Sequence, residues 1–96
     1  MVESDIRLHA IVEGRVQGVG FRYFVLEHAN RLEVKGWVRN TYQGNVEVTA
    51  EGCRADLDSL LDLLNQGPHG SYVTRVIQDW FPASGEFDHF GVSRTV

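Results

Sequence analysis

The sequence predicts an α+β fold, a split βαβ sandwich in which an antiparallel sheet carries two helices on one face. Segments with the two-residue period of strands and segments with helical periodicity follow one another in the order β-α-β-β-α-β. The 96 residues suffice for one hydrophobic core but not for two. Residues 1–96 are therefore expected to form a single domain.

The first strand and the first helix flank a glycine-rich stretch. Over residues 6–12 apolar side chains alternate with others, as in a strand with one buried face. Three glycines then interrupt the pattern, at Gly14, Gly18 and Gly20. Beyond them helical spacing is shown by Phe21, Phe24, Val25, His28, Ala29 and Leu32. The predicted order is strand, glycine loop, helix.

A hairpin and a second helix follow. Residues 34–39 and 45–51 predict two strands, which a turn over residues 41–44 connects. An amphipathic helix is predicted by leucines at positions i, i+3, i+4 and i+7, namely Leu57, Leu60, Leu61 and Leu64. Gly67 and Pro68 are a strong signal for the end of this helix.

The last strand is predicted over residues 73–81, and its facing stays open. Its apolar residues fall on both faces of a regular strand, with Val73 and Ile77 on one and Val76 and Trp80 on the other. A short segment around Phe90 and Val92 predicts an additional edge strand.

Composition excludes several classes of function. A net charge of -4 and a pI near 5.4 argue against a general binder of nucleic acids or anionic membranes. No apolar run approaches the roughly 20 residues of a membrane span, and residues 1–10 contain Glu3 and Asp5 without a hydrophobic signal core. A cytoplasmic location is expected. Cys53 is the only cysteine, and the four histidines lack metal-ligand spacing, so we expect no intrachain disulfide, no metal and no cofactor. Whether Cys53 forms an intermolecular disulfide stays open.

Residues 14–22, GRVQGVGFR, have the features of an anion site. A glycine-rich turn that opens a helix can direct backbone N–H groups to one point, where the helix dipole is positive. Arg22 adds a planar guanidinium that can hold two phosphate oxygens. The candidate phosphate-binding residues are Arg15, Val16, Gln17, Gly18, Val19, Gly20 and Arg22. In the competing interpretation the glycines only make a tight turn and Arg22 is solvated.

Residues 36–47, GWVRNTYQGNVE, place Asn40 at the end of a strand, where packing does not require an apolar side chain. Asn40 is the second candidate for a catalytic residue. The alternative is that it only forms the turn, since asparagine often hydrogen-bonds its own backbone there.

Together the two stretches resemble the signatures of the acylphosphatase family. GRVQGVGFR is similar to G-x-V-Q-G-V-x-F-R, and GWVRNTYQGNVE is similar to G-W-V-x-N-x-x-x-G-x-V-E, with every fixed position met. Gly67-Pro68 and the later Phe90-Gly91-Val92 also look like the family, so the resemblance covers about residues 6–92. Two departures are Ser71, where the family often has alanine, and the tail over residues 93–96, which lacks a terminal aromatic and leaves C-terminal packing open.

The resemblance implies a ferredoxin-like fold and metal-independent hydrolysis of acyl phosphates to a carboxylate and inorganic phosphate. It assigns phosphate binding to the glycine loop with Arg22 and the positioning of water to Asn40. The expected partner is a small-molecule acyl phosphate, for which carbamoyl, acetyl and aspartyl phosphates are equally suitable. Inorganic phosphate is expected as product and inhibitor, and the chain as a monomer without nucleic-acid or membrane partners.

Other proteins with the same element order are not enzymes. An RNA-binding version stacks bases on aromatic residues of its inner strands, whereas the outward residues predicted here are Glu47, Thr49 and Glu51, which would repel RNA. A metal-carrying version would need paired cysteines. A third possibility is a domain fused to larger carbamoyl-transfer proteins, and a free chain with polar ends favours the standalone enzyme.

Overall fold

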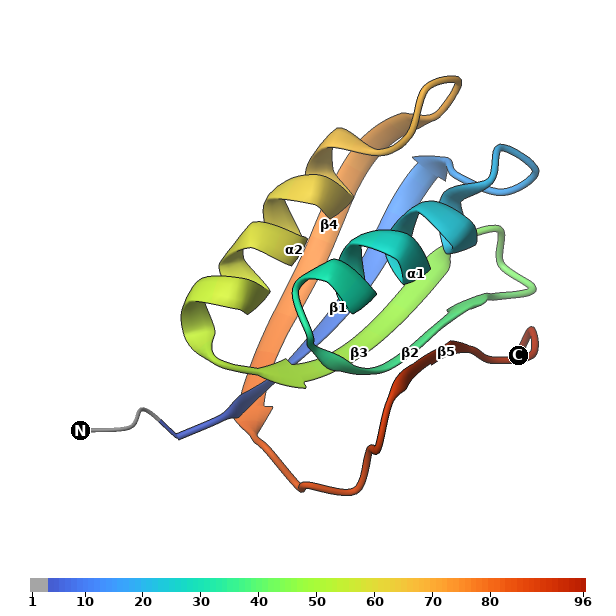
Figure 1. The fold of residues 1–96 in the computed structure, drawn as a ribbon. Helices are drawn as coiled ribbons and strands as arrows, with labels where there is room; N and C mark the ends of the chain where they lie inside the picture. Colours follow the sequence, from blue (N-terminus) through green and yellow to red (C-terminus); the bar gives the residue numbers. More distant parts are fainter. Residues whose placement is uncertain (1–3) are drawn as a thin grey trace.

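A five-stranded sheet with both helices on one face forms the body of the molecule (Figure 1). The structure is a computed structural model that describes residues 4–96, so Glu3 lies outside the described range. The elements are β1 (Ile6–Arg15), α1 (Phe21–Arg31), β2 (Lys35–Asn40), β3 (Val46–Gly52), α2 (Arg54–Gln66), β4 (Tyr72–Pro82) and β5 (Phe90–Val92). The predicted ferredoxin-like α+β sandwich is confirmed.

The strands lie in the order β4-β1-β3-β2-β5. β1 pairs antiparallel with both β3 and β4, and β2 and β3 form the predicted antiparallel hairpin. The short segment at Phe90 is a strand that pairs parallel with β2, with Gly36 opposite Phe90. The four antiparallel strands are thus extended at one edge by a parallel one, which makes the sheet mixed.

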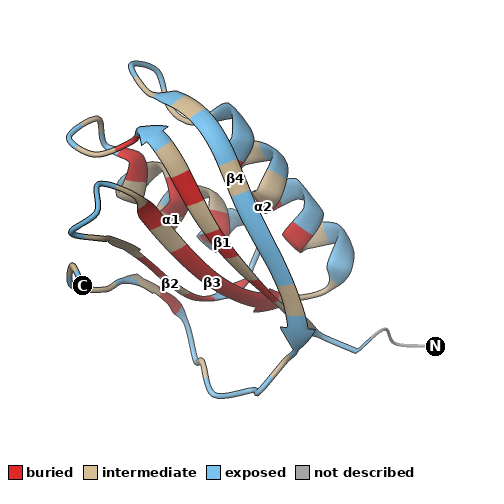
Figure 2. Ribbon diagram, turned by 180° about the vertical axis from the view of Figure 1, so that it is seen from behind, coloured by how far each residue is buried: buried red, intermediate tan, exposed pale blue. Residues whose placement is uncertain are grey.

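The core lies between the sheet and the helices. Figure 2 shows the buried residues along β1 and β3 and on the helix faces turned toward the sheet. They include Leu8, Ala10 and Val12 from β1, Val46, Val48 and Ala50 from β3, Val25 and Ala29 from α1, and Leu57, Leu60 and Leu64 from α2. The helical spacing predicted for both helices is confirmed, and Gly67 caps α2 by donating its N–H to the Leu63 carbonyl at 2.8 Å.

An irregularity in the pairing of β1 with β4 settles which side chains of β4 face the helices. Glu13 lies opposite Arg75, but Gly14 lies opposite Val73, so β4 has one residue more than β1 at this point. An extra residue reverses the alternation of side chains. Val73 therefore joins Val76 and Trp80 against the core, whereas Ile77 is exposed on the other face.

Gly14 is required at this bulge for steric reasons. Its φ is 126°, in the region that favours glycine, and a Cβ there would lie 2.1 Å from the Tyr72 carbonyl oxygen. The first signature glycine thus shapes the end of β1 just before the loop.

The face of the sheet without helices differs from the acidic surface expected from the sequence. Glu47, Thr49 and Glu51 do lie on this face, but Thr49 and Glu51 are buried. Arginine Nε atoms bind both carboxylates, Arg39 on Glu47 at 2.8 Å and Arg7 on Glu51 at 2.7 Å. The carboxylates of this face are therefore not bare, because neighbouring strands supply cations that pair with them. That this face repels RNA stays a prediction.

Glu51 also anchors the chain that follows β4. Its carboxylate accepts hydrogen bonds from the backbone N–H groups of Ser84 at 2.8 Å and Gly85 at 3.0 Å, besides the one from Arg7. Burial alone would raise the pKa of Glu51, but these donors outweigh it and hold the pKa below its ordinary value. The folded state therefore favours the ionised carboxylate.

Replacing Glu51 with glutamine is expected to lower the free energy of unfolding by roughly 2 kcal/mol at pH 7, because bonds to a charged group are lost. Since the pKa is lowered by folding, this contribution is complete above the unfolded-state pKa and disappears as the pH falls through the folded-state pKa. Urea denaturation between pH 7 and pH 3 should show the deficit shrinking toward acid. Glu27→Gln, which removes an exposed pair with Arg31, should change stability by less than about 0.5 kcal/mol. A deficit independent of pH would contradict the electrostatic explanation.

Candidate active site

The glycine loop connects the end of β1 to the start of α1. Gly18 and Gly20 adopt left-handed backbone conformations, with φ of 74° and 76°, and Gly20 is the N-cap of the helix. A Cβ at either position would meet no atom within 4 Å. The backbone of both glycines is therefore open to approach from outside.

Apolar side chains hold the loop from the inside. Val16 and Phe21 are buried in the core, and Val19 packs against it. Every second or third residue of the loop thus packs into or against the core, while Gly18 and Gly20 are exposed. Burial of Val16 and Phe21 contributes roughly 1.5–3 kcal/mol each by area, which favours one loop conformation.

Arg22 and Asn40 line the same hollow. Its volume is about 130 Å³, and its lining consists of Val16, Gly18, Gly20, Phe21, Arg22, Tyr23 and Asn40. Arg22 comes from the first turn of α1, and Asn40 is the last residue of β2. The fold therefore brings together the two residues that the sequence singled out, from separate elements.

The Arg22 guanidinium stands apart from most other arginines of the chain. Arginines 7, 31, 39, 54 and 75 each form an ion pair with a carboxylate. Within residues 4–96, Arg22 makes no such pair, and no carboxylate lines the hollow. The first turn of α1 also contains no acidic residue that would offset the positive end of the helix dipole. The hollow is thus suited to an anion.

Asn40 is held through its backbone. It pairs with Val46 in the hairpin, and its carbonyl accepts a hydrogen bond from the Val96 N–H at 3.2 Å. In the described part of the chain its carboxamide makes no hydrogen bond to protein. The turn is instead closed by Thr41, whose Oγ1 accepts from the Asn45 N–H at 3.1 Å. This geometry does not favour the interpretation of Asn40 as a turn former.

The remaining predicted loop residues do not put their side chains into the hollow. Arg15 is exposed at the end of β1, and Val19 packs inward. Gln17 reaches away to the hairpin turn, where its Nε2 donates to the carbonyls of Thr41 at 2.8 Å and Asn45 at 2.9 Å. Sequence reasoning missed Tyr23, which lines the hollow although most of its side chain is exposed, and its place directly after Arg22 was the available signal.

The C-terminal tail runs beside β2 toward the hollow. Ser93 donates its N–H to the Val38 carbonyl at 2.8 Å, and the Tyr42 N–H donates to Val96 at 2.9 Å. The question that the sequence left open about C-terminal packing is thereby answered: backbone bonds hold the tail, and no aromatic residue is needed for them.

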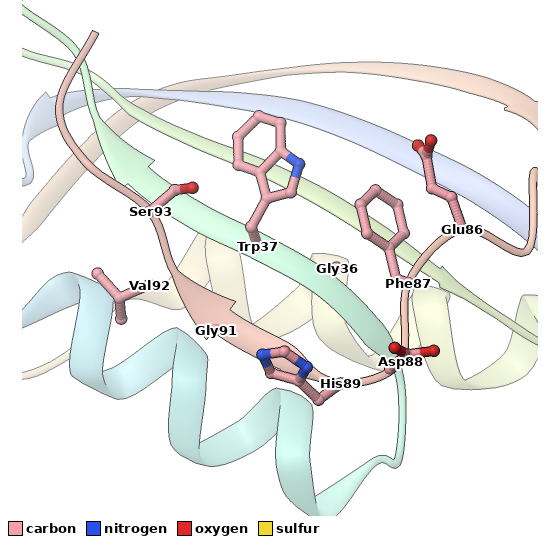
Figure 3. A pocket seen from close by; sticks show the side chains of 9 residues that line it. All are labelled: Gly36, Trp37, Glu86, Phe87, Asp88, His89, Gly91, Val92 and Ser93. Atoms are coloured by element: carbon pink, nitrogen blue, oxygen red, sulfur yellow. The ribbon is translucent and has the colours of Figure 1, made fainter.

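A second hollow lies at the opposite end of β2 (Figure 3). Its volume is about 270 Å³, and Trp37 and Phe87 project to the same side of the sheet there, while His89 lies beside β5. Arg39 covers the Trp37 ring at 4.3 Å from the ring centroid. No residue of the glycine loop lines this hollow.

Across residues 4–96, His, Cys, Asp and Glu side chains nowhere form a group of three or more that could hold a metal ion. Neither helix of the described chain has the length and apolar character needed to cross a membrane.

Comparison with known proteins identifies similar sequences and structures. The family model described as Acylphosphatase matches residues 8–92. A protein of Salinibacter ruber named acylphosphatase is 46% identical over 91 residues, which cover 95% of this chain and 96% of that protein. One of Mycolicibacterium vanbaalenii with the same name is 49% identical over 80 residues, covering 83% and 86%. The crystal structure of acylphosphatase from Bacillus subtilis superimposes with a TM-score of 0.89 at 36% identity, covering 92% and 98%.

Proposed function

Because the chain belongs to the acylphosphatase family, we propose that it hydrolyses the carboxyl-phosphate bond of acyl phosphates to a carboxylate and inorganic phosphate. The observation that supports this most is the hollow lined jointly by Gly18, Gly20, Arg22 and Asn40. It combines a cation, open backbone and an unengaged carboxamide in one small space.

The phosphoryl group is held by the glycine loop and Arg22. The transition state of phosphoryl transfer is loose, with charge spread over the peripheral oxygens, so catalysis depends on positioning and charge stabilisation. The Arg22 fork can bind two of these oxygens, and the start of α1 adds a positive dipole end. Both features lower the free energy of the transition state relative to that of the substrate free in water.

Asn40 orients the attacking water. Its carboxamide oxygen accepts and its nitrogen donates, so it can hold a water in line, but it cannot ionise and does not act as a base. No strong base is required because the transition state is loose. The leaving carboxylate has a conjugate acid with a pKa of roughly 4 to 5, so no general acid is required either. The reaction proceeds without a metal in this mechanism.

Phosphate release from an aryl-acyl phosphate tests the proposal. Hydrolysis is expected to persist in excess EDTA, because Arg22 supplies the charge that a Lewis acid would otherwise provide. Inorganic phosphate is expected to inhibit competitively, since it would bind to the same groups as the phosphoryl group of the substrate. We call these groups, the glycine loop and Arg22, the phosphate cradle. Loss of activity in EDTA that one divalent ion restores would overturn the metal-free mechanism, and no phosphate release at all would overturn the function.

The same assay separates the enzyme from a non-catalytic binding module, because a binding module releases no phosphate. We further propose a monomeric, single-domain enzyme of the cytoplasm. The single cysteine, Cys53, suits a reducing compartment.

A further inference from the structure

Gln17 connects two segments that are distant in the sequence. Its Nε2 donates to the Thr41 carbonyl at 2.8 Å and to the Asn45 carbonyl at 2.9 Å. A glutamine amide has two N–H donors on one nitrogen, so both are used here. Thr41 and Asn45 stand at the two ends of the hairpin turn that follows Asn40.

These two hydrogen bonds connect the glycine loop to the hairpin turn beyond the point where the backbone pairing of the sheet ends. The backbone pairing between β1 and β3 ends with Val12 opposite Val46. Beyond it, in the described chain, no backbone hydrogen bond joins residues 16–20 to residues 41–45. The Gln17 amide takes over the connection at the point where the strands have separated.

The bridge joins the two halves of the proposed site. Gln17 lies between Val16 and Gly18, which both line the hollow, and Thr41 directly follows Asn40. The loop would hold the phosphoryl group, whereas Asn40 would hold the water. The distance between loop and turn therefore sets the distance between the two reactants.

We infer that Gln17 is a positioning residue that keeps Asn40 in register with the phosphate loop, and that it acts on the rate of the water attack without touching the substrate. This inference rests on the proposed function. Glutamine suits the role because it is neutral and donates twice, whereas a glutamate would face two carbonyl oxygens with a negative charge. A displacement of about 1 Å in such a geometry can cost on the order of 10²-fold in rate.

The first test is Gln17→Met, which keeps the length of the side chain and removes both donors. We expect kcat to fall roughly 10- to 100-fold, while the inhibition constant of inorganic phosphate stays within about threefold, because the cradle itself is intact. Gln43→Met is the matched control, since Gln43 is exposed in the same turn. It should leave both constants unchanged.

A double-mutant cycle with Asn40→Ala then identifies the route of the effect. If Gln17 acts through Asn40, Gln17→Met should lower kcat of the wild type but not that of Asn40→Ala. An equal loss in both backgrounds would show a general structural role and overturn the inference. So would a wild-type kcat for Gln17→Met, or a weakening of phosphate inhibition as large as the loss of kcat.

Two further controls keep the outcomes distinct. Should Gln17→Met fail to fold in a thermal melt, Gln17→Asn, which keeps the amide but is one methylene too short to reach both carbonyls, undergoes the same cycle with the same expected result. A wild type that releases no phosphate under these conditions overturns the proposed function. An active wild type with an equally active Gln17→Met overturns the positioning role alone.

Discussion

Lysine in place of Arg22 is expected to lower kcat/KM roughly 10²- to 10³-fold, although the positive charge is kept. An ammonium group is a compact point charge and cannot bind two phosphoryl oxygens in the plane that the guanidinium offers. Phosphate inhibition should weaken together with the rate, because the same contacts hold ground state and product. Steady-state kinetics and a phosphate titration measure both.

The fold should tolerate this change. Arg22 is only half-buried and forms no ion pair within residues 4–96, so its replacement removes little protein contact. Arg31→Lys, at the other end of α1 and paired with the exposed Glu27, is the control and should retain full activity. If Arg22→Lys worked at nearly the wild-type rate, Arg22 would be no more than a nearby charge and the bidentate role would be refuted.

Alanine in place of Asn40 should lower kcat about 10²-fold or more and leave phosphate affinity nearly unchanged. The reason is that Asn40 comes from β2, whereas the proposed phosphate-binding groups come from the glycine loop and the start of α1. Its replacement should therefore leave phosphate binding intact. Only the oriented water is lost. Asn30→Ala on the exposed side of α1 is the matched control.

Three measurements on Asn40→Ala distinguish the possible roles: a thermal melt, a phosphate titration and steady-state kinetics. The melt should be close to that of the wild type, because Thr41 and Asn45 close the turn. Unfolding would instead support Asn40 as a turn former. A joint loss of phosphate binding and rate would place it in the cradle.

Local patterns predicted most of the fold, because hydrophobic periodicity and glycine positions act within one element. The facing of β4 could not be predicted in this way. It depends on Thr74, the extra residue opposite the step from Glu13 to Gly14, and a bulge exists only once two strands have paired. The neutralised carboxylates on the open face were missed for the same reason, since Arg7 meets Glu51 only across the pairing of β1 with β3.

For the site, the resemblance of two motifs to the family's signatures selected Arg22 and Asn40, and both line one hollow. The sequence did not distinguish which residues of the loop turn toward this hollow. Gln17 was grouped with the phosphate-binding residues, yet its side chain binds carbonyls 24 and 28 residues further along the chain. The backbone carbonyls that this side chain binds come within reach only in the tertiary fold, so the local sequence could not predict these hydrogen bonds.

The position of β1 between β3 and β4 has a consequence for synthesis on the ribosome. β1 is translated well before β4, which pairs along one of its edges. Every residue that lines the hollow precedes β4, so a nascent chain can contain the complete set while β1 still exposes unpaired N–H and C=O groups along the edge that β4 later covers. Such an edge can pair with other chains, which makes the interval before β4 emerges the time when a nascent chain gains most from a chaperone.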